Sequence, residues 1–346
     1  MTPPHDAAAP EPPPELAAAL SRLNLVSAGE RPRFTPLPGG VSSDIWRVDL
    51  ASGPLCVKRA LPKLKVAAEW RAPVERNAYE VAWMETAGRI LPGSAPRIRG
   101  HDSAAGLFAM EFLDPALYRL WKTELRDGRA DPGFAAAVGR SLAAIHAGTA
   151  DDPAVASRFA TDAIFHAIRL EPYLEATARA HPDHAAALAA LVAVTAQTKR
   201  TLVHGDVSPK NILVGPGGPV FLDAECAWYG DPAFDFAFCL NHLLLKCLWR
   251  PQAAARFLDC FGALVASYCA GVAWEAPAAL ERRAARLLPG LLLARIDGKS
   301  PVEYIAAEAD KTMVRKTAGW LLAKPVERLA AVADSWRKAL AGTKLG

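Results

Sequence analysis

The pattern of hydrophobic and polar positions changes once along the chain, near residue 114. Before that point, short alternating or apolar runs bounded by turn residues predict strands. One helix is expected before the first strand pair and one after it. The expected strands are Ile45–Leu50, Pro54–Lys58, Arg97–Gly100 and Gly106–Phe112, and the expected helices are Leu16–Leu25 and Pro73–Arg89.

Beyond Asp114-Pro115 the pattern is mainly helical. The exception is a pair of apolar runs around the turn Gly215–Pro219, which predicts a hairpin. The chain is therefore expected to adopt an α+β fold of two lobes. Residues 1–14, rich in Pro and Ala, are expected to be a disordered tail, 15–112 a small mixed N-terminal lobe with an antiparallel sheet, and 113–346 a larger, mainly helical C-terminal lobe. Alanine-rich helices are expected at Phe134–Ala147, His184–Thr198 and Gln252–Ala270.

The segment around this hairpin carries the chemistry. His204-Gly205-Asp206 is followed by Asn211, and the apolar pair Phe221-Leu222 is followed by Asp223. Phosphoryl transfer from Mg-ATP needs a carboxylate to receive the proton of the attacking hydroxyl and oxygen ligands for the metal. We therefore assign Asp206 as the catalytic base, which orients the substrate hydroxyl and accepts its proton late in the transfer. Asn211 and Asp223 are assigned as Mg²⁺ ligands.

This order of residues resembles the catalytic and metal-binding loops of the protein-kinase-like fold, in the form used by the aminoglycoside phosphotransferase and choline kinase family. The resemblance implies that ATP and Mg²⁺ are the cofactors. It also implies structural roles for His204, which would brace the metal loop, and for Asp235, which would accept hydrogen bonds from backbone amides of the catalytic loop. Lys210 is a weaker candidate for a phosphate contact, because its offset differs from that in protein kinases.

Lys58 ends an apolar strand in the Val-x-Lys context in which kinases hold the α- and β-phosphates. Such a lysine needs a carboxylate from the following helix to fix its rotamer. Glu80 is the preferred partner because of its mid-helix position. The sequence also leaves open Glu69, Glu75 and Glu85.

Two further segments are expected to bind the nucleotide. Ser42 and Ser43 follow Gly39-Gly40 in a loop that would cover the phosphates, although an ordinary hairpin turn is the alternative. The strand ending at Phe112 is expected to be the hinge between the lobes, where the backbone carbonyl of Glu111 and the N–H of Leu113 would read the adenine edge.

A second resemblance is local. Lys58-Arg59-Ala60-Leu61-Pro62 and Asp223-Ala224-Glu225 are similar to segments of methylthioribose kinases. This similarity implies that Glu225 is a second carboxylate ligand of the metal, the alternative being a surface glutamate. The catalytic loop, with Asn211, and the glycine loop both depart from that family's pattern.

The acceptor side is less explicit in the sequence. Arg295 and Asp297 follow the apolar run Leu287–Leu293 and are expected either to bind sugar hydroxyls or to form a buried ion pair. Arg282-Arg283 is an alternative, as a counterpart of the paired arginines of methylthioribose kinases.

Composition narrows the class of protein. A net charge of +4 over 346 residues, without a basic tract, argues against nucleic acid as a partner. Scattered cysteines, an N-terminus unlike a signal peptide and the lack of a long uncharged apolar run predict a soluble cytoplasmic protein without a membrane partner. The sequence does not indicate an oligomeric state.

The expected function is a small-molecule kinase that moves the γ-phosphoryl group of Mg-ATP to a hydroxyl, with a methylthioribose-like sugar as the preferred acceptor. An aminoglycoside- or choline-type phosphotransferase is the alternative. A pseudokinase binding module is disfavoured because the lysine, base and metal ligands are all present. A protein kinase is disfavoured because no Ala-Pro-Glu segment follows Asp223.

Overall fold

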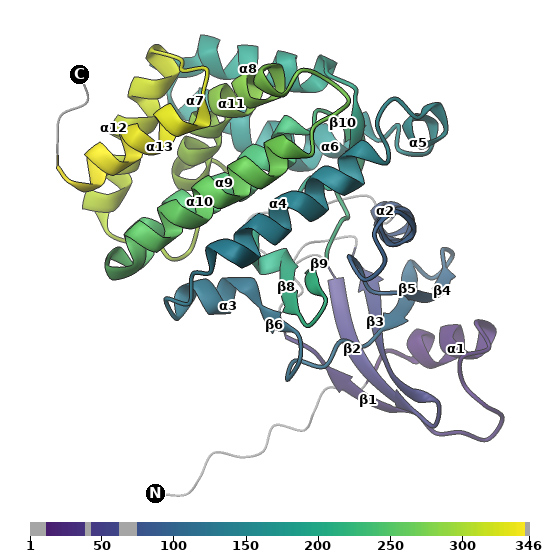
Figure 1. The fold of residues 1–346 in the computed structure, drawn as a ribbon. Helices are drawn as coiled ribbons and strands as arrows, with labels where there is room; N and C mark the ends of the chain where they lie inside the picture. Colours follow the sequence, from purple (N-terminus) through teal and green to yellow (C-terminus); the bar gives the residue numbers. More distant parts are fainter. Residues whose placement is uncertain (1–11, 39–42, 62–74, 343–346) are drawn as a thin grey trace, which may run out of the picture.

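The computed structural model of the protein describes residues 12–38, 43–61 and 75–342 (Figure 1). A five-stranded antiparallel sheet forms the N-terminal part, in the order β1-β2-β3-β5-β4. Its strands are β1 (Arg33–Pro36), β2 (Ser43–Leu50), β3 (Gly53–Ala60), β4 (Ile98–Asp102) and β5 (Leu107–Glu111), and its helices are α1 (Pro14–Arg22) and α2 (Arg76–Ile90).

The two faces of this sheet have different tasks, because successive side chains of a strand point to opposite faces. On β3, Leu55 and Val57 belong to a small core that is completed by Leu16 and Leu20 of α1. The residues between and after them, including Lys58, face the other way, toward α2 and the cleft between the lobes. The alternation of β3 thus directs Lys58 into the cleft.

The remainder of the described chain is mainly helical, with short strands near the lobe boundary (Figure 1). Its helices are α3 (Trp121–Arg126), α4 (Pro132–Ala147), α5 (Pro153–Arg158), α6 (Asp162–Phe165), the π-helix η1 (His166–Glu175), α7 (Ala176–Ala180), η2 (Pro182–His184), α8 (Ala185–Gln197), η3 (Pro209–Asn211), α9 (Ala233–Trp249), η4 (Pro251–Ala253), α10 (Ala254–Ala270), α11 (Pro277–Asp297), α12 (Glu308–Ala323) and α13 (Leu329–Leu340).

Helices α4 and α10 lie side by side in this lobe (Figure 1). Gly139 of α4 permits their close approach, since a Cβ there would lie only 2.7 Å from the carbonyl oxygen of Leu264. The segment Pro251–Ala270 is long and apolar enough to cross a membrane by length and composition alone. It includes Arg256 and Asp259, and the buried face of α10 packs in the core, as expected for a helix of a globular lobe.

Strands β8 (Ile212–Gly215) and β9 (Gly218–Phe221), next to the predicted catalytic and metal-binding residues, lie between the sheet and the helices (Figure 1). Strand β7 (Thr201–Val203) pairs with β10 (Trp228–Gly230), and β8 pairs with both β6 (Arg119–Leu120) and β9. The loops between these strands reach the interlobe cleft.

The structure confirms the predicted α+β class, with an antiparallel N-terminal sheet and a helical remainder. Each predicted strand and helix is present with boundaries shifted by a few residues. The predicted disordered tail 1–14 lies mostly outside the described residues, and its last residue, Pro14, begins α1. The boundary between residues 112 and 113 stays a prediction.

Candidate active site

A cleft of about 710 Å³ lies between the two lobes. Its N-terminal wall comes from β2, β3, β5 and α2, and its C-terminal wall from the loops around β8 and β9 and from the helices η1, α9 and α11. Most of the predicted site residues that the structure describes line this cleft. They are Ser43, Lys58, Glu80, Glu111, Leu113, Asp206, Asn211, Asp223, Glu225 and Arg295.

Lys58 forms the centre of a buried charge cluster. Its Nζ lies 2.8 Å from both carboxylate oxygens of Glu80 and also bonds Asp223. Burial alone would lower the pKa of Lys58, but the carboxylates of Asp223 and Glu80 outweigh it and raise that pKa, so the lysine stays charged. Glu80 is thus the partner that the structure provides, while Glu85 pairs with Arg158 and Glu69 lies outside the described residues.

Asp235, in the first turn of α9, fixes the catalytic loop by hydrogen bonds to its backbone. Its two carboxylate oxygens accept the backbone N–H groups of His204 (2.6 Å) and Gly205 (2.8 Å). Gly205 has a φ of +79°, and a Cβ there would lie 2.7 Å from Cys226, so the loop requires glycine at this point. The Nε2 atom of His146 lies 3.3 Å from Oδ2 of Asp235. The resemblance assigned this architectural role to Asp235, and the contacts agree with it.

Replacing Asp235 by alanine is expected to destabilise the fold by on the order of 3–5 kcal/mol. The substitution leaves two buried backbone N–H groups and one buried imidazole without their acceptor. Urea unfolding measures the loss, with Asp259→Ala, an exposed aspartate of α10, as the control. A loss below about 1 kcal/mol would contradict the bracing role.

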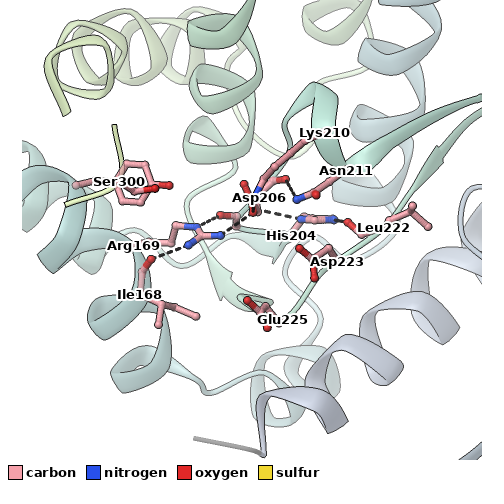
Figure 2. A network of polar contacts seen from close by, with 12 residues as sticks. Ile168, Arg169, His204, Asp206, Lys210, Asn211, Leu222, Asp223, Glu225 and Ser300 are labelled. Carbon is pink, nitrogen blue, oxygen red and sulfur yellow. Dashed lines mark hydrogen bonds and ion pairs between the residues drawn. The ribbon is translucent and has the colours of Figure 1, made fainter. Parts of the chain in front are cut away.

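His204 connects the catalytic loop to the metal loop (Figure 2). Its Nδ1 accepts the backbone N–H of Asp206 at 3.1 Å, and its Nε2 lies 3.0 Å from the carbonyl oxygen of Leu222, next to Asp223. Burial lowers the pKa of His204, which favours the neutral ring that this pattern needs, with one nitrogen accepting and the other donating. The residue therefore sets the spacing between the two loops and has no need to transfer a proton.

Asp206 points into the cleft and touches two cations (Figure 2). Its Oδ2 lies 3.0 Å from Nη2 of Arg169 and 3.2 Å from Nζ of Lys210. These contacts fix the orientation of the carboxylate. They also place two positive charges beside Asp206 in the lining of the cleft.

Three side chains offer oxygen ligands for a metal along one wall of the cleft: Asn211, Asp223 and Glu225 (Figure 2). Asn211 donates its Nδ2 to the carbonyl of Asp206 at 3.1 Å, which leaves its Oδ1 for a cation. Asp223 has a φ of +66°, a conformation that non-glycine residues seldom adopt and that often marks a functional position. Burial alone would raise the pKa of Asp223, but the charges of Lys58 and Lys210 outweigh it and hold that pKa well below its usual range.

This donor set fits Mg²⁺, which prefers oxygen ligands. No group of three or more His, Cys, Asp or Glu side chains in the described part of the chain is spaced to hold a metal by itself. A nucleotide-bound Mg²⁺ needs only one or two carboxylates, because phosphates and waters complete its shell. Glu225 lies in the cleft but its Oε2 accepts from Nε of Arg76 at 2.9 Å, so it is already engaged in a salt bridge.

The structure describes three of the four other residues that are predicted to bind the nucleotide. Ser43 begins β2, is buried and lines the cleft, whereas Ser42 lies outside the described residues. Glu111 and Leu113 line the cleft at the end of β5. The Glu111 side chain pairs with Arg97 at 2.9 Å, and an adenine contact of the backbone at Glu111 and Leu113 stays a prediction.

Two expectations for the acceptor side need correction. Arg295 and Asp297 do not pair with each other, because residues two apart on a helix point in different directions. Arg295 lines the cleft, whereas Asp297 is bound by Arg315 of α12 at 2.7 Å and by His181 at 2.8 Å. The predicted substrate role of Asp297 therefore has no support in its position.

The arginine pair Arg282-Arg283 is also engaged elsewhere. Arg283 forms bidentate contacts with Asp231 (3.0 Å) and with Glu275 (2.7 Å). Arg282 lies 3.5 Å from Glu327. Neither arginine is part of the cleft lining, so the correspondence with the paired arginines of methylthioribose kinases does not hold.

Sequence reasoning did not identify Arg169, one of the two cations that touch Asp206. It lies on η1, whose π-helical turn contains Pro172. A proline inside a helix removes one hydrogen bond, and π-turns occur frequently at functional sites. Pro172 within an otherwise helical run was the one available signal, and it did not point to a particular residue.

Comparisons with known proteins agree with this geometry. A family model described as "Phosphotransferase enzyme family" matches residues 33–263, which include β1 to β10 and the whole catalytic loop. The chain is 28% identical over 228 residues to a methylthioribose kinase of Pectobacterium carotovorum subsp. carotovorum. That match covers 58% of this chain and 56% of the relative, so the chain spans little more than half the length of the relative.

Solved structures show the same fold at low identity. A choline kinase from Cryptosporidium parvum Iowa II has a TM-score of 0.56 and 11% identity, covering 92% of this chain and 99% of that one. A Plasmodium vivax ethanolamine kinase has a TM-score of 0.54 and 12% identity, covering 94% and 85%. The expected kinase-like fold is thereby confirmed. Since the family model matches well over half of the sequence, the chain belongs to the phosphotransferase enzyme family.

Proposed function

We propose that the protein is a small-molecule kinase that transfers the γ-phosphoryl group of Mg-ATP to a hydroxyl of its substrate. One observation carries the proposal. A buried lysine with its glutamate partner, an aspartate in the αL conformation, an asparagine and a cleft-facing aspartate converge on one cleft in a member of the phosphotransferase family. Each of these groups has a task in phosphoryl transfer.

In the proposed reaction, Lys58, kept charged by Glu80, contacts the α- and β-phosphates. Asp223 and Asn211 would hold Mg²⁺, which supplies neutralisation of phosphate charge when bound. Asp206 orients the acceptor hydroxyl toward the γ-phosphorus. As the new oxygen–phosphorus bond forms and the bond to the bridging oxygen of ADP breaks, the hydroxyl proton passes to Asp206 and ADP leaves.

A sugar is the first acceptor to test, because the matched relative is a methylthioribose kinase. In this proposal the protein is cytoplasmic and its substrate is a free small molecule. Neither a nucleic acid nor a membrane is a partner. Glu225 is proposed as an auxiliary metal ligand, with its salt bridge to Arg76 limiting how far it can reach.

The direct test is acceptor-dependent release of ADP. Purified protein with Mg-ATP is offered methylthioribose, other sugars, amino alcohols and aminoglycosides, and phosphorus NMR identifies the ester that forms. The proposal expects at least one acceptor to give a phosphate ester. Tight Mg-ATP binding without release of ADP for any acceptor class would instead support a nucleotide-binding module.

A further inference from the structure

One half of the cleft lies beyond Asp206 on the side of the C-terminal lobe and is not needed for holding the nucleotide. We call it the acceptor half. Its wall comes from η1, the start of α3, one face of α9, the end of α11 and the loop after α11. Apart from Asp206, its titratable side chains are Lys122, Arg169, Tyr173, Lys210, His242, Arg295 and Glu303.

Every carboxylate of the acceptor half already has a cationic partner. Glu303 pairs with Lys122, and Asp206 contacts both Arg169 at 3.0 Å and Lys210 at 3.2 Å. Burial lowers the pKa of His242, so its ring is neutral and adds no charge. The acceptor half therefore carries positive charge in excess.

Arg295 is a cation of the acceptor half that forms no ion pair with the described residues. It is buried, 9% exposed, and lines the cleft, but no carboxylate of the described residues lies within ion-pair distance of it. Its Nη1 donates to the hydroxyls of Tyr173 (3.1 Å) and Ser300 (3.0 Å), and also to the Ser300 carbonyl. Its Nε is buried and has no partner among the described residues.

An isolated buried charge is costly unless it is paired. The contacts to Tyr173 and Ser300, all made by Nη1, hold the guanidinium in place without supplying a negative charge. They leave Nη2 for an incoming ligand, since the buried Nε is out of its reach. A guanidinium N–H donates a strong, charge-assisted hydrogen bond to a carboxylate or phosphate oxygen.

Arg295 is connected to the proposed base, Asp206, through Tyr173 and Arg169. The ring of Tyr173 is close to two guanidinium groups, with Cζ of Arg169 5.6 Å and Cζ of Arg295 5.5 Å from its centroid. Arg169 in turn touches Asp206. Figure 2 shows Ser300, the partner of Arg295, on the side of Arg169 away from Asp223. A small acceptor with its hydroxyl at Asp206 can therefore extend to Arg295.

We propose that the acceptor is an anion: a small hydroxylated compound whose carboxylate or phosphate group binds Arg295 while its hydroxyl lies at Asp206. The proposal rests on the proposed kinase function and specifies its substrate class. A polycationic aminoglycoside or a quaternary amine would meet Arg295 and Arg169 as like charges, and such juxtaposition disfavours binding.

Matched series of acceptors test the class. One series is ribose, ribonate and ribose 5-phosphate, and the other is glycerol, glycerate and glycerol 3-phosphate. Within a series, the carboxylate or the phosphate is expected to bind at least about tenfold more tightly than the neutral compound, as one charge-assisted hydrogen-bond pair provides. Calorimetric titration measures binding and ADP release measures turnover. The two anionic members of each series distinguish carboxylate from phosphate recognition.

The variant that tests the residue is Arg295→Gln. For the preferred anionic acceptor, its dissociation constant and KM are expected to rise about 10- to 100-fold, with the KM for ATP within about twofold. Arg295→Lys should recover part of the loss. The matched control is Arg315→Gln, which removes one positive charge on α12 that binds Asp297 outside the cleft. If Arg295→Gln does not fold, Ser300→Ala removes one positioning contact, keeps the charge, and is expected to raise KM a fewfold.

The outcomes separate the two proposals. Acceptor-dependent ADP release with neutral or cationic compounds as good as the anions would overturn the anionic acceptor and leave the kinase function in place. Loss of ATP affinity in Arg295→Gln together with unchanged binding of the anion would also overturn it. No Mg-ATP binding and no turnover with any compound would remove the kinase function and this inference with it.

Discussion

Replacing Asp206 by asparagine is expected to lower kcat by about 10²–10⁴-fold, the usual contribution of a positioned acid–base group. The structure explains why the effect should be specific. Asparagine has nearly the same shape, and the backbone of the loop is held by His204 and Asp235 independently of this side chain. What disappears is the carboxylate that receives the hydroxyl proton, together with its charge toward Arg169 and Lys210. The affinity for Mg-ATP should stay within about twofold, because Asp206 does not hold the nucleotide.

Single-turnover kinetics and a nucleotide titration measure these two effects separately. Asp334→Asn, an exposed aspartate of α13, is the matched control and should change neither quantity. Turnover of Asp206→Asn within about tenfold of the unmodified protein would contradict the assignment of the base. Loss of Mg-ATP affinity equal to the loss of kcat would indicate that Asp206 belongs to the metal site.

The parts of the site that could be predicted are those encoded within one element or one loop. The alternation of β3 determines which way Lys58 points, and the helical spacing of α2 favours Glu80 among four glutamates. The loop that carries Asp206 and Asn211 is short, so its spacing fixes the relative positions of both residues. The same holds for Asp223, which lies two residues after the end of β9.

The parts that could not be predicted depend on partners from distant segments. Arg169 reaches Asp206 from another element, at the π-helical turn of η1, and no local pattern identifies that contact. Asp297 finds its partner, Arg315, on the next helix of the chain, so the sequence suggested a pairing with Arg295 that helix geometry forbids. The sequence contains these charged residues but does not show which of them meet in the folded chain or line the cleft.

The second large effect is expected at Asp223, the proposed Mg²⁺ ligand. Asp223→Asn is expected to weaken Mg-dependent nucleotide affinity by about 10²- to 10³-fold, because several kcal/mol of charge stabilisation at the metal are lost. Lys58 keeps Glu80 as its partner in this variant, so the buried ammonium is not left unpaired and the fold should persist. Nucleotide binding measured with Mg²⁺ and with EDTA separates the metal-dependent part from the rest.

Glu225→Gln provides the comparison within the same wall of the cleft. If Glu225 is an auxiliary ligand, the Mg²⁺ concentration needed for half-maximal nucleotide binding should rise several-fold, less than for Asp223→Asn. If its task is only to hold Arg76, the Mg²⁺ dependence will stay unchanged while the melting temperature falls, since the salt bridge at 2.9 Å would be lost from a buried arginine. An Asp223→Asn protein with unaltered Mg²⁺ dependence would move the metal away from Asp223 altogether. The strained backbone at this residue would then need another explanation, and its contact with Lys58 is the one that the structure offers.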